Sequence, residues 1–249
     1  MSEFVKKPNL PDKKVKKVII DYRTNSASVK RLEQLGVEVV KTKKTDRLYN
    51  SVCGHADMQI FHLGGNSFVC EPTVWEYYKN KLPNARIIKG KTSVSDKYPF
   101  DIAYNGALAG DCFFHNLNFT ESTIYEYYKS GSGKLINVKQ GYTKCSVCVI
   151  AENAIITSDI KICESAKNYG IDAVYVDPSD IKLSGMSNGF VGGICGLIDK
   201  HTLAVNGDVM LTSFGRKFVG FCDKHEVSVA SLFCGIPEDI GSILPIEQG

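Results

Sequence analysis

Two segments of the sequence, residues 73–80 and 123–130, repeat each other at an offset of 50 residues. The first reads Thr-Val-Trp-Glu-Tyr-Tyr-Lys-Asn and the second Thr-Ile-Tyr-Glu-Tyr-Tyr-Lys-Ser, so most positions match or nearly match. Both segments are amphipathic at helical spacing, and each is followed by a turn and an apolar strand. Repeats of this length are typical of folds built from similar units, which bury a core only by packing on their neighbours. The chain is therefore expected to consist of such units.

Five helix-then-strand pairs are expected from apolar periodicity and from helix-ending glycines such as Gly36 and Gly170. Glycines at positions 54, 106, 141 and 189 open the strand pairs that follow. The fifth strand pair is expected to be split between the chain ends, with residues 241–246 pairing with 18–23, which removes exposed sheet edges. The expected helix-and-strand pairs are 25–36 with 37–40, 73–82 with 85–88, 121–130 with 134–138, 160–170 with 171–176, and 213–225 with 227–232.

These units predict an α/β fold, a five-bladed ββαβ propeller with pseudo-fivefold symmetry that is closed by pairing of the N- and C-terminal strands. A doubly wound sheet is the competing α/β interpretation, but each helix-to-helix interval holds about three strands rather than one. Any function is expected on the axis where the units meet. Residues 1–14 are predicted to form a flexible basic tail, and residues 15–249 a single domain.

The composition is that of an ordinary globular protein. No run of about 18 apolar residues is present, so no membrane span is expected. The nine cysteines have no framework spacing and the N-terminus lacks a secretory signal, which together predict a cytoplasmic protein. Six lysines crowd residues 6–17, although the net charge is only +3. A nucleic-acid-binding arm is the minority interpretation of this tail, because no RNA-binding aromatic motif follows it.

Two short motifs carry a resemblance to a known superfamily. Gly54-His55-Ala56-Asp57 looks like a Gly-His-x-Asp strand, and Gly64-Gly65-Asn66 stands in the following turn. With the five-unit ring, these motifs resemble the pentein fold of the amidinotransferase superfamily, which includes arginine and agmatine deiminases, dimethylarginine hydrolases and amidinotransferases. The chain as a whole is similar to an uncharacterised bacterial family assigned the same fold.

The resemblance implies a Cys-dependent hydrolase or amidinotransferase that acts on a small guanidino or amidino molecule. In such enzymes a thiolate attacks the guanidinium carbon, a His moves protons, and carboxylates bind the planar N–H groups in pairs. His55 and Asp57 lie two apart on a predicted strand, so both side chains are expected on one face, as proton shuttle and substrate clamp. The alternative is a His–Asp hydrogen bond that only holds a strand end.

Two cysteines are candidates for the nucleophile. Cys145 lies two repeats after His55, and its setting Gly-Tyr-Thr-Lys-Cys resembles the Cys strand of the dimethylarginine hydrolases. Cys195, in Gly-Gly-Ile-Cys-Gly, resembles the Gly-rich Cys loop of the deiminases, but it lies three repeats on. At either position the alternative is a small buried apolar side chain.

Three further residues are candidates for substrate binding. Asp21 and Arg23 end the first strand on one face, and they loosely replace an acidic Phe-x-Arg-Asp segment of the deiminases that is absent here. Their alternative role is a capping pair before the first helix. Asp111 stands in the same register after Gly106 as Asp57 does after Gly54.

No metal and no resident cofactor are expected. Cys145 and Cys148 lie three apart on a predicted strand and so face opposite sides, as do Cys112 and His115. Cys222 and His225 share a predicted helix face, but two ligands do not make a zinc site. The second functional hypothesis is a non-catalytic module of the same fold that binds a protein, a ribosome or a small ligand. A homodimer is left open.

Overall fold

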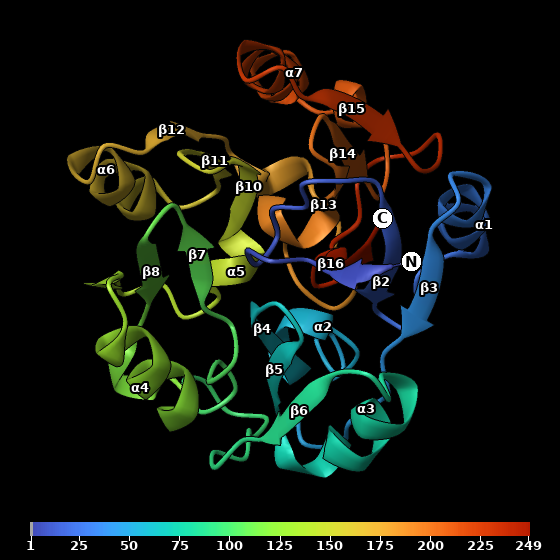
Figure 1. Cartoon of the computed structure of the whole chain (residues 1–249). Helices are drawn as coiled ribbons and strands as arrows, with labels where there is room; N and C mark the ends of the chain where they lie inside the picture. Colours follow the sequence, from blue (N-terminus) through green and yellow to red (C-terminus); the bar gives the residue numbers. More distant parts are fainter. Residues whose placement is uncertain (1) are drawn as a thin grey trace.

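Five small β-sheets lie around the centre of the molecule, and five helices cover them on the outside (Figure 1). The structure is a computed structural model, and it describes residues 2–249. Four sheets have three strands each and one has four. Their strands are β4 (Ile60–Gly64), β5 (Ser67–Cys70), β6 (Arg86–Lys89); β7 (Ala107–Ala109), β8 (Cys112–His115), β9 (Lys134–Asn137); β10 (Val147–Ala151), β11 (Ala154–Thr157), β12 (Asp172–Tyr175); β13 (Cys195–Asp199), β14 (Thr202–Val205), β15 (Ser228–Ser231); and β1 (Glu3–Phe4), β16 (Leu244–Gln248), β2 (Val15–Ile20), β3 (Glu38–Lys41).

Every sheet has the same local order. An antiparallel pair comes first, as in β4 and β5, and a third strand then joins in parallel after a helix, as β6 does. The fivefold recurrence of this order confirms the predicted helix-then-strand pairs. The connecting helices are α1 (Ser26–Gln34), α3 (Trp75–Lys81), α4 (Ser122–Ser130), α6 (Ile160–Asn168) and α7 (Gly215–Lys224).

Local sequence explains where these helices begin and end. The side chain of Asn25 accepts a hydrogen bond from the Ser28 amide at the start of α1, and Asp159 caps α6 through the amides of its first turn. Such caps satisfy amides that have no partner within the helix. Gly36 and Gly170, predicted as helix ends, have φ angles of +81° and +78°, a conformation that glycine adopts at little cost.

The two ends of the chain meet in one sheet. β16 pairs antiparallel with β2, and Leu244 lies opposite Ile19, so the predicted pairing of the terminal segments is present. The first residues differ from the predicted mobile tail, because β1 pairs with β16 and Val5 is fully buried. The apolar Phe4 and Val5 provide the physical reason, since their burial draws this lysine-rich segment onto the sheet.

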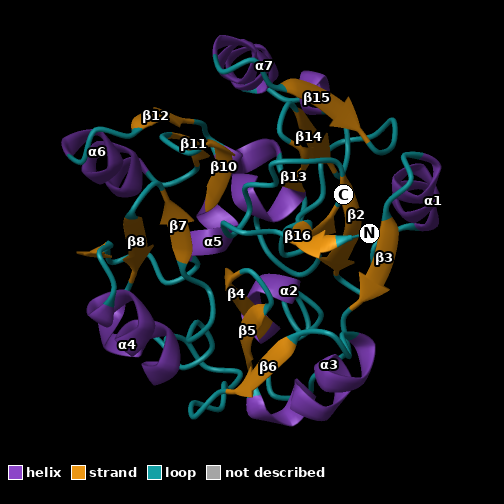
Figure 2. Ribbon diagram, in the orientation of Figure 1, coloured by secondary structure: helices purple, strands orange, loops and turns teal. Residues whose placement is uncertain are grey.

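Two segments predicted as strands are helical turns at the centre of the molecule: α2 (Ala56–Gln59) and α5 (Thr143–Ser146) (Figure 2). A third, η4 (Val191–Ile194), is a 3-10 turn. Each turn stands directly before the first strand of its sheet. A helical turn provides backbone hydrogen-bond partners within the segment, which suits a crowded centre where backbone groups are buried. Within residues 2–249, every helix is too short or too polar to cross a lipid bilayer.

Candidate active site

The segments that precede the first strand of each sheet are joined by hydrogen bonds at the centre. Asn105, just before β7, accepts bonds at Oδ1 from the amides of Lys144 (2.8 Å) and Cys145 (3.2 Å). The Lys144 ammonium donates to Ser242 Oγ at 2.8 Å, and both side chains are buried. The Ser242 hydroxyl in turn lies 2.9 Å from Asp57 Oδ2 and 2.9 Å from the carbonyl oxygen of Gly192. This network holds α2 and α5 in fixed positions relative to each other.

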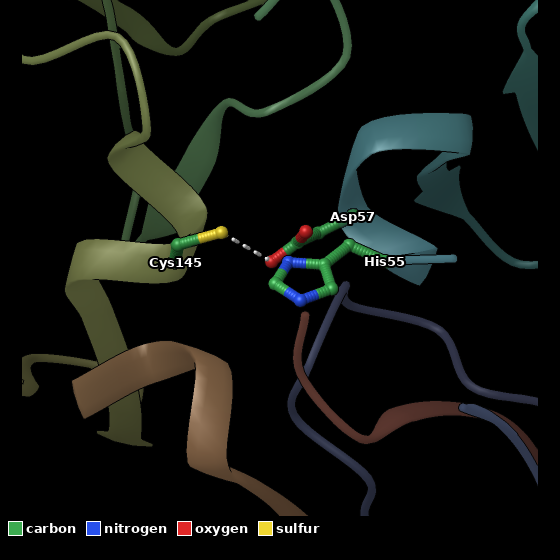
Figure 3. Close-up of side chains that lie close together, drawn as sticks. All are labelled: His55, Asp57 and Cys145. Atoms are coloured by element: carbon green, nitrogen blue, oxygen red, sulfur yellow. Dashed lines mark hydrogen bonds between the residues drawn. The ribbon is translucent and has the colours of Figure 1, made fainter. Parts of the chain in front are cut away.

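His55, Asp57 and Cys145 come together within this network (Figure 3). Cys145 Sγ donates to Asp57 Oδ2 at 3.1 Å and accepts from Asn105 Nδ2 at 3.3 Å. One nitrogen of His55, one carboxylate oxygen of Asp57 and the sulfur of Cys145 all lie within 4.8 Å of one another. The structure therefore brings the predicted His–Asp pair to Cys145, although the pair lies at the start of a helical turn rather than on a strand.

Several polar atoms of this group lack partners. Both ring nitrogens of His55 and Oδ1 of Asp57 are buried and make no hydrogen bond, and the His55 side chain is only 1 % exposed. Buried polar atoms are almost always hydrogen-bonded, because an unpaired one costs about 1–3 kcal/mol. Free donors and acceptors that face a nucleophile are typical of a site that is completed by a ligand.

Asp239 was not among the predicted site residues, yet it lies beside His55. Its Oδ1 lies 3.9 Å from His55 Nδ1, and its carboxylate is held by the amides of Phe190 (2.8 Å) and Gly241 (2.9 Å). A Cβ atom on Gly193 would lie 1.9 Å from this carboxylate, so the glycine is needed for the close approach. The only sequence signal was a carboxylate two residues before Gly241, the residue that begins the segment predicted to complete the fifth unit.

The thiol is neutral in this environment. Burial raises the pKa of Cys145 well above its usual value, and the negative charges of Asp57 and Asp239 raise it further. Burial likewise raises the pKa of Asp239. Only the thiolate is a strong nucleophile, so Cys145 requires a cation nearby before it can react.

A cavity of about 140 Å³ opens onto the group. Cys145, His55 and Asp239 form its polar end, and its walls are mainly aromatic and aliphatic. Its remaining lining residues are Tyr49, Val52, Tyr142, Leu183, Met186, Ser187, Asn188 and Phe190. A concave, mostly apolar pocket with a few convergent polar groups is the usual form of a small-molecule site.

The other predicted site residues are not part of the His55–Asp57–Cys145 group. Cys195 Sγ lies 2.9 Å from Cys148 Sγ and 3.2 Å from the Val191 carbonyl, inside a hydrophobic core cluster. Asp21 is buried and accepts two bonds from Arg23 Nε and a third from Nη2, so neither side chain is free. Asp111 is exposed in the turn between β7 and β8, and it is not brought to the group.

The side chains of His55, Asp57 and Cys145 could also hold a metal ion. His55, Asp57 and Cys145 offer nitrogen, oxygen and sulfur ligands of the kinds that zinc accepts. Cys145 and Cys148, which form a Cys-x-x-Cys pair in the sequence, lie in α5 and β10 and contact different residues, Asp57 and Cys195.

Comparison with known proteins supports the fold and leaves the activity open. A family model described as a family of unknown function (DUF6873) matches residues 19–244. No curated protein sequence matches the chain.

Among solved structures, the chain is similar to the amidinotransferase SxtG of the saxitoxin pathway from Microseira wollei, with 11 % identity over 93 % of this chain and 92 % of that one and a TM-score of 0.55. It is also similar to the dimethylarginine hydrolase DDAH from Pseudomonas aeruginosa, determined as a Cys-to-Ser mutant with citrulline. That match has 9 % identity, covers 88 % of this chain and 92 % of that one, and has a TM-score of 0.52. The inosamine-phosphate amidinotransferase StrB1 from Streptomyces griseus matches with 10 % identity, 93 % and 94 % coverage, and a TM-score of 0.51. At these identities the likeness shows the fold alone: the chain has the fold of these amidinotransferase and hydrolase structures.

Proposed function

Since the chain belongs to the DUF6873 family and has the fold of the pentein amidinotransferases and hydrolases, we propose that it is a Cys-dependent enzyme acting on a small guanidino or amidino compound. The observation that carries the proposal is the buried group of His55, Asp57 and Cys145, which has free nitrogen and oxygen atoms. His55 and Cys145 of this group, together with Asp239, form the polar end of the cavity. The proposal assigns Cys145 as nucleophile, His55 as proton shuttle, and Asp57 and Asp239 as substrate clamps.

The charge balance of the site favours a cationic substrate. Two carboxylates and a neutral thiol lie close together, and a guanidinium offers planar N–H donors that match carboxylate oxygens. Its positive charge beside Sγ would offset the effect of Asp57 and Asp239, which hold the thiol pKa high. The thiolate would then form only when the substrate is bound, which limits reaction with other electrophiles.

The proposed reaction has two steps. In the first, His55 takes the thiol proton, Sγ bonds to the guanidino carbon, and the C–N bond to the leaving amine breaks as His55 returns the proton to that nitrogen. A thiouronium then links Cys145 to the amidino carbon. In the second, His55 takes a proton from water, the oxygen bonds to carbon, and the C–S bond breaks as His55 passes that proton to Sγ. A urea is released, and the proton of the new hydroxyl group goes to solvent. Attack by an amine instead of water gives amidino transfer.

The test combines product release with selective labelling. Simple guanidines should release ammonia, urea or an amine, and 2-chloroacetamidine should label Cys145 in preference to the exposed Cys234. Cys145→Ser and His55→Gln should each lower turnover by at least about 100-fold, whereas the matched control Cys195→Ser should retain it. No product and no selective labelling would support the alternative, a binding module without catalysis.

The same proposal includes a finer description of the fold. We infer that the five sheets are blades of a closed pentein propeller with pseudo-fivefold symmetry, formed by residues 15–249 as one domain. The β2–β16 pairing and the recurring strand order support this description. All nine cysteines are free thiols, which supports a reducing compartment such as the cytoplasm.

A further inference from the structure

The lining of the active-site cavity lacks a Lys or Arg partner for a carboxylate. Of its eleven side chains, all within the described residues 2–249, none is Lys or Arg, and its one charged carboxylate is Asp239. Asp57 adds a second negative side chain next to Cys145. The electrostatic environment at the polar end is therefore acidic.

Among the described residues, two cationic side chains near the site are already engaged, and a third, Lys182, lines a neighbouring depression with Leu183 and Met186 but does not line the cavity. Arg23 lies in an adjoining depression, where it pairs with Asp21 and donates to the carbonyl oxygens of Asn50 and Ser51. Lys144 is 6 % exposed, and its ammonium donates to Ser242. Neither group lines the cavity. A substrate carboxylate would therefore be buried without a compensating charge, which is strongly unfavourable.

The walls favour an uncharged chain instead. Tyr49, Tyr142 and Phe190 supply aromatic surface, while Leu183 and Met186 supply aliphatic surface. Aromatic faces attract a cation and also pack against methylene groups. The volume of about 140 Å³ is below the roughly 300–1,000 Å³ of drug-sized ligand pockets, so the ligand is small.

We propose that the substrate is a small alkylguanidine or alkylamidine that carries no carboxylate, rather than an amino acid such as arginine. This inference rests on the proposed function, and it narrows the substrate class of the same site. Recognition uses the acidic polar end for the guanidinium and the aromatic walls for a short apolar chain.

Two compounds that differ by one carboxylate test the inference: ethylguanidine and 3-guanidinopropionate. Each is added to the full-length protein, and the rate of Cys145 alkylation by iodoacetamide is followed by peptide mass spectrometry. Ethylguanidine should protect Cys145 at a concentration at least about tenfold lower than 3-guanidinopropionate, because burial of an unpaired carboxylate costs more than the 1.4 kcal/mol that a factor of ten represents. Equal or stronger protection by 3-guanidinopropionate would overturn the inference.

A gain-of-function variant gives an independent check. Met186 lines the cavity and is 50 % exposed, so Met186→Arg should be tolerated and should place a cation at the mouth. The ratio between the two compounds should then shift toward 3-guanidinopropionate, whereas the matched control Met210→Arg, at a residue 54 % exposed outside the cavity, should leave it unchanged. An unchanged ratio in Met186→Arg would count against the inference.

The outcome also separates the two proposals. Preferential protection by ethylguanidine without product from either compound would refute the catalytic proposal and support the ligand preference. Turnover of 3-guanidinopropionate but not of ethylguanidine would refute the preference and support catalysis. Protection by neither compound at millimolar concentration would overturn both.

Discussion

The C-terminal segment packs against His55 so closely that one methyl group at Gly241 should disturb the site. An ideal Cβ atom built on Gly241 would lie 2.3 Å from His55 Cβ and 2.4 Å from Cγ. Carbon atoms in contact are about 3.5–4.0 Å apart, so the two groups must separate by roughly 1.2 Å in Gly241→Ala. Gly241 also has a φ of +64°, at which an L-residue loses about 1–2 kcal/mol.

Gly170→Ala is the matched control, because Gly170 has a φ of +78° and no atom within 4 Å of the position that a Cβ would take. It should lose about 1 kcal/mol of unfolding free energy from the backbone alone. Gly241→Ala should lose about 2–4 kcal/mol, since overpacking adds roughly 1–3 kcal/mol. Urea unfolding monitored by circular dichroism measures both values.

Gly241→Ala and Gly170→Ala should differ more in activity than in stability. A displacement of about 1 Å of a catalytic group can lower turnover by about 100-fold, and Gly241→Ala displaces His55 by that order. Gly170→Ala should keep the wild-type turnover of a guanidine. Equal stability losses in the two variants, or full activity in Gly241→Ala, would refute the described packing of this segment on His55.

Three further predictions concern the charges around Cys145. Asp57→Asn removes a negative charge that raises the pKa of the Cys145 thiol, so neutral iodoacetamide should alkylate Cys145 faster at pH 8. The same substitution removes a proposed substrate clamp, so guanidine turnover should fall about 30-fold or more. Slower alkylation of Cys145 in Asp57→Asn would contradict the first expectation. The pKa of the Cys145 thiol is raised in the folded protein, so this thiol stays protonated when folded, whereas in the unfolded chain it ionises above about pH 8.5. The free energy of unfolding should therefore fall as the pH rises above that value. Cys145→Ala should flatten the fall by up to about 1.4 kcal/mol per pH unit, and identical pH profiles would be incompatible with the raised pKa. Zinc ions should protect Cys145 from alkylation, because His55, Asp57 and Cys145 converge as possible ligands, and EDTA should restore the alkylation. Protection by zinc that is unchanged in His55→Gln would exclude this ligand set.

The local sequence pattern was sufficient to predict the outer helices and the strands that follow them. The amphipathic repeat at residues 73–80 and 123–130 lies in η1 (Pro72–Val74) with α3 and in α4, respectively. Their periodicity and caps are encoded within each segment, so neighbouring units are not needed to recognise them. His55 and Asp57 were identified for the same reason, since four consecutive residues contain both.

Contacts between distant segments could not be predicted in the same way. Asp239 reaches His55 only because the last segment of the chain returns to the centre, where the Asp57 amide bonds to the Gly241 carbonyl at 3.3 Å. Asn105 likewise links α2 and α5 through contacts to Asp57, 48 residues before it, and to Cys145, 40 residues after it. No residue spacing within one segment encodes these approaches.

The strand assignment of the centre was wrong for a related reason. Gly54 and Gly141 were expected to open strand pairs that include His55 and Cys145, but the buried centre favours helical turns that satisfy their own amides. Arg23 was expected to bind substrate, yet Asp21, only two residues away, already occupies its guanidinium. Short-range pairing of this kind competes with any proposed ligand role.

The central claim is that Cys145 forms a covalent bond to the amidino carbon of its substrate. The most direct measurement is acid-quench mass spectrometry of the peptides after the protein is mixed with ethylguanidine, with His55→Gln included to slow breakdown of the adduct. An adduct with the mass of an amidino group is expected on the Cys145 peptide and on no other cysteine peptide. An adduct on Cys195, or none on Cys145 while product still forms, would contradict the claim.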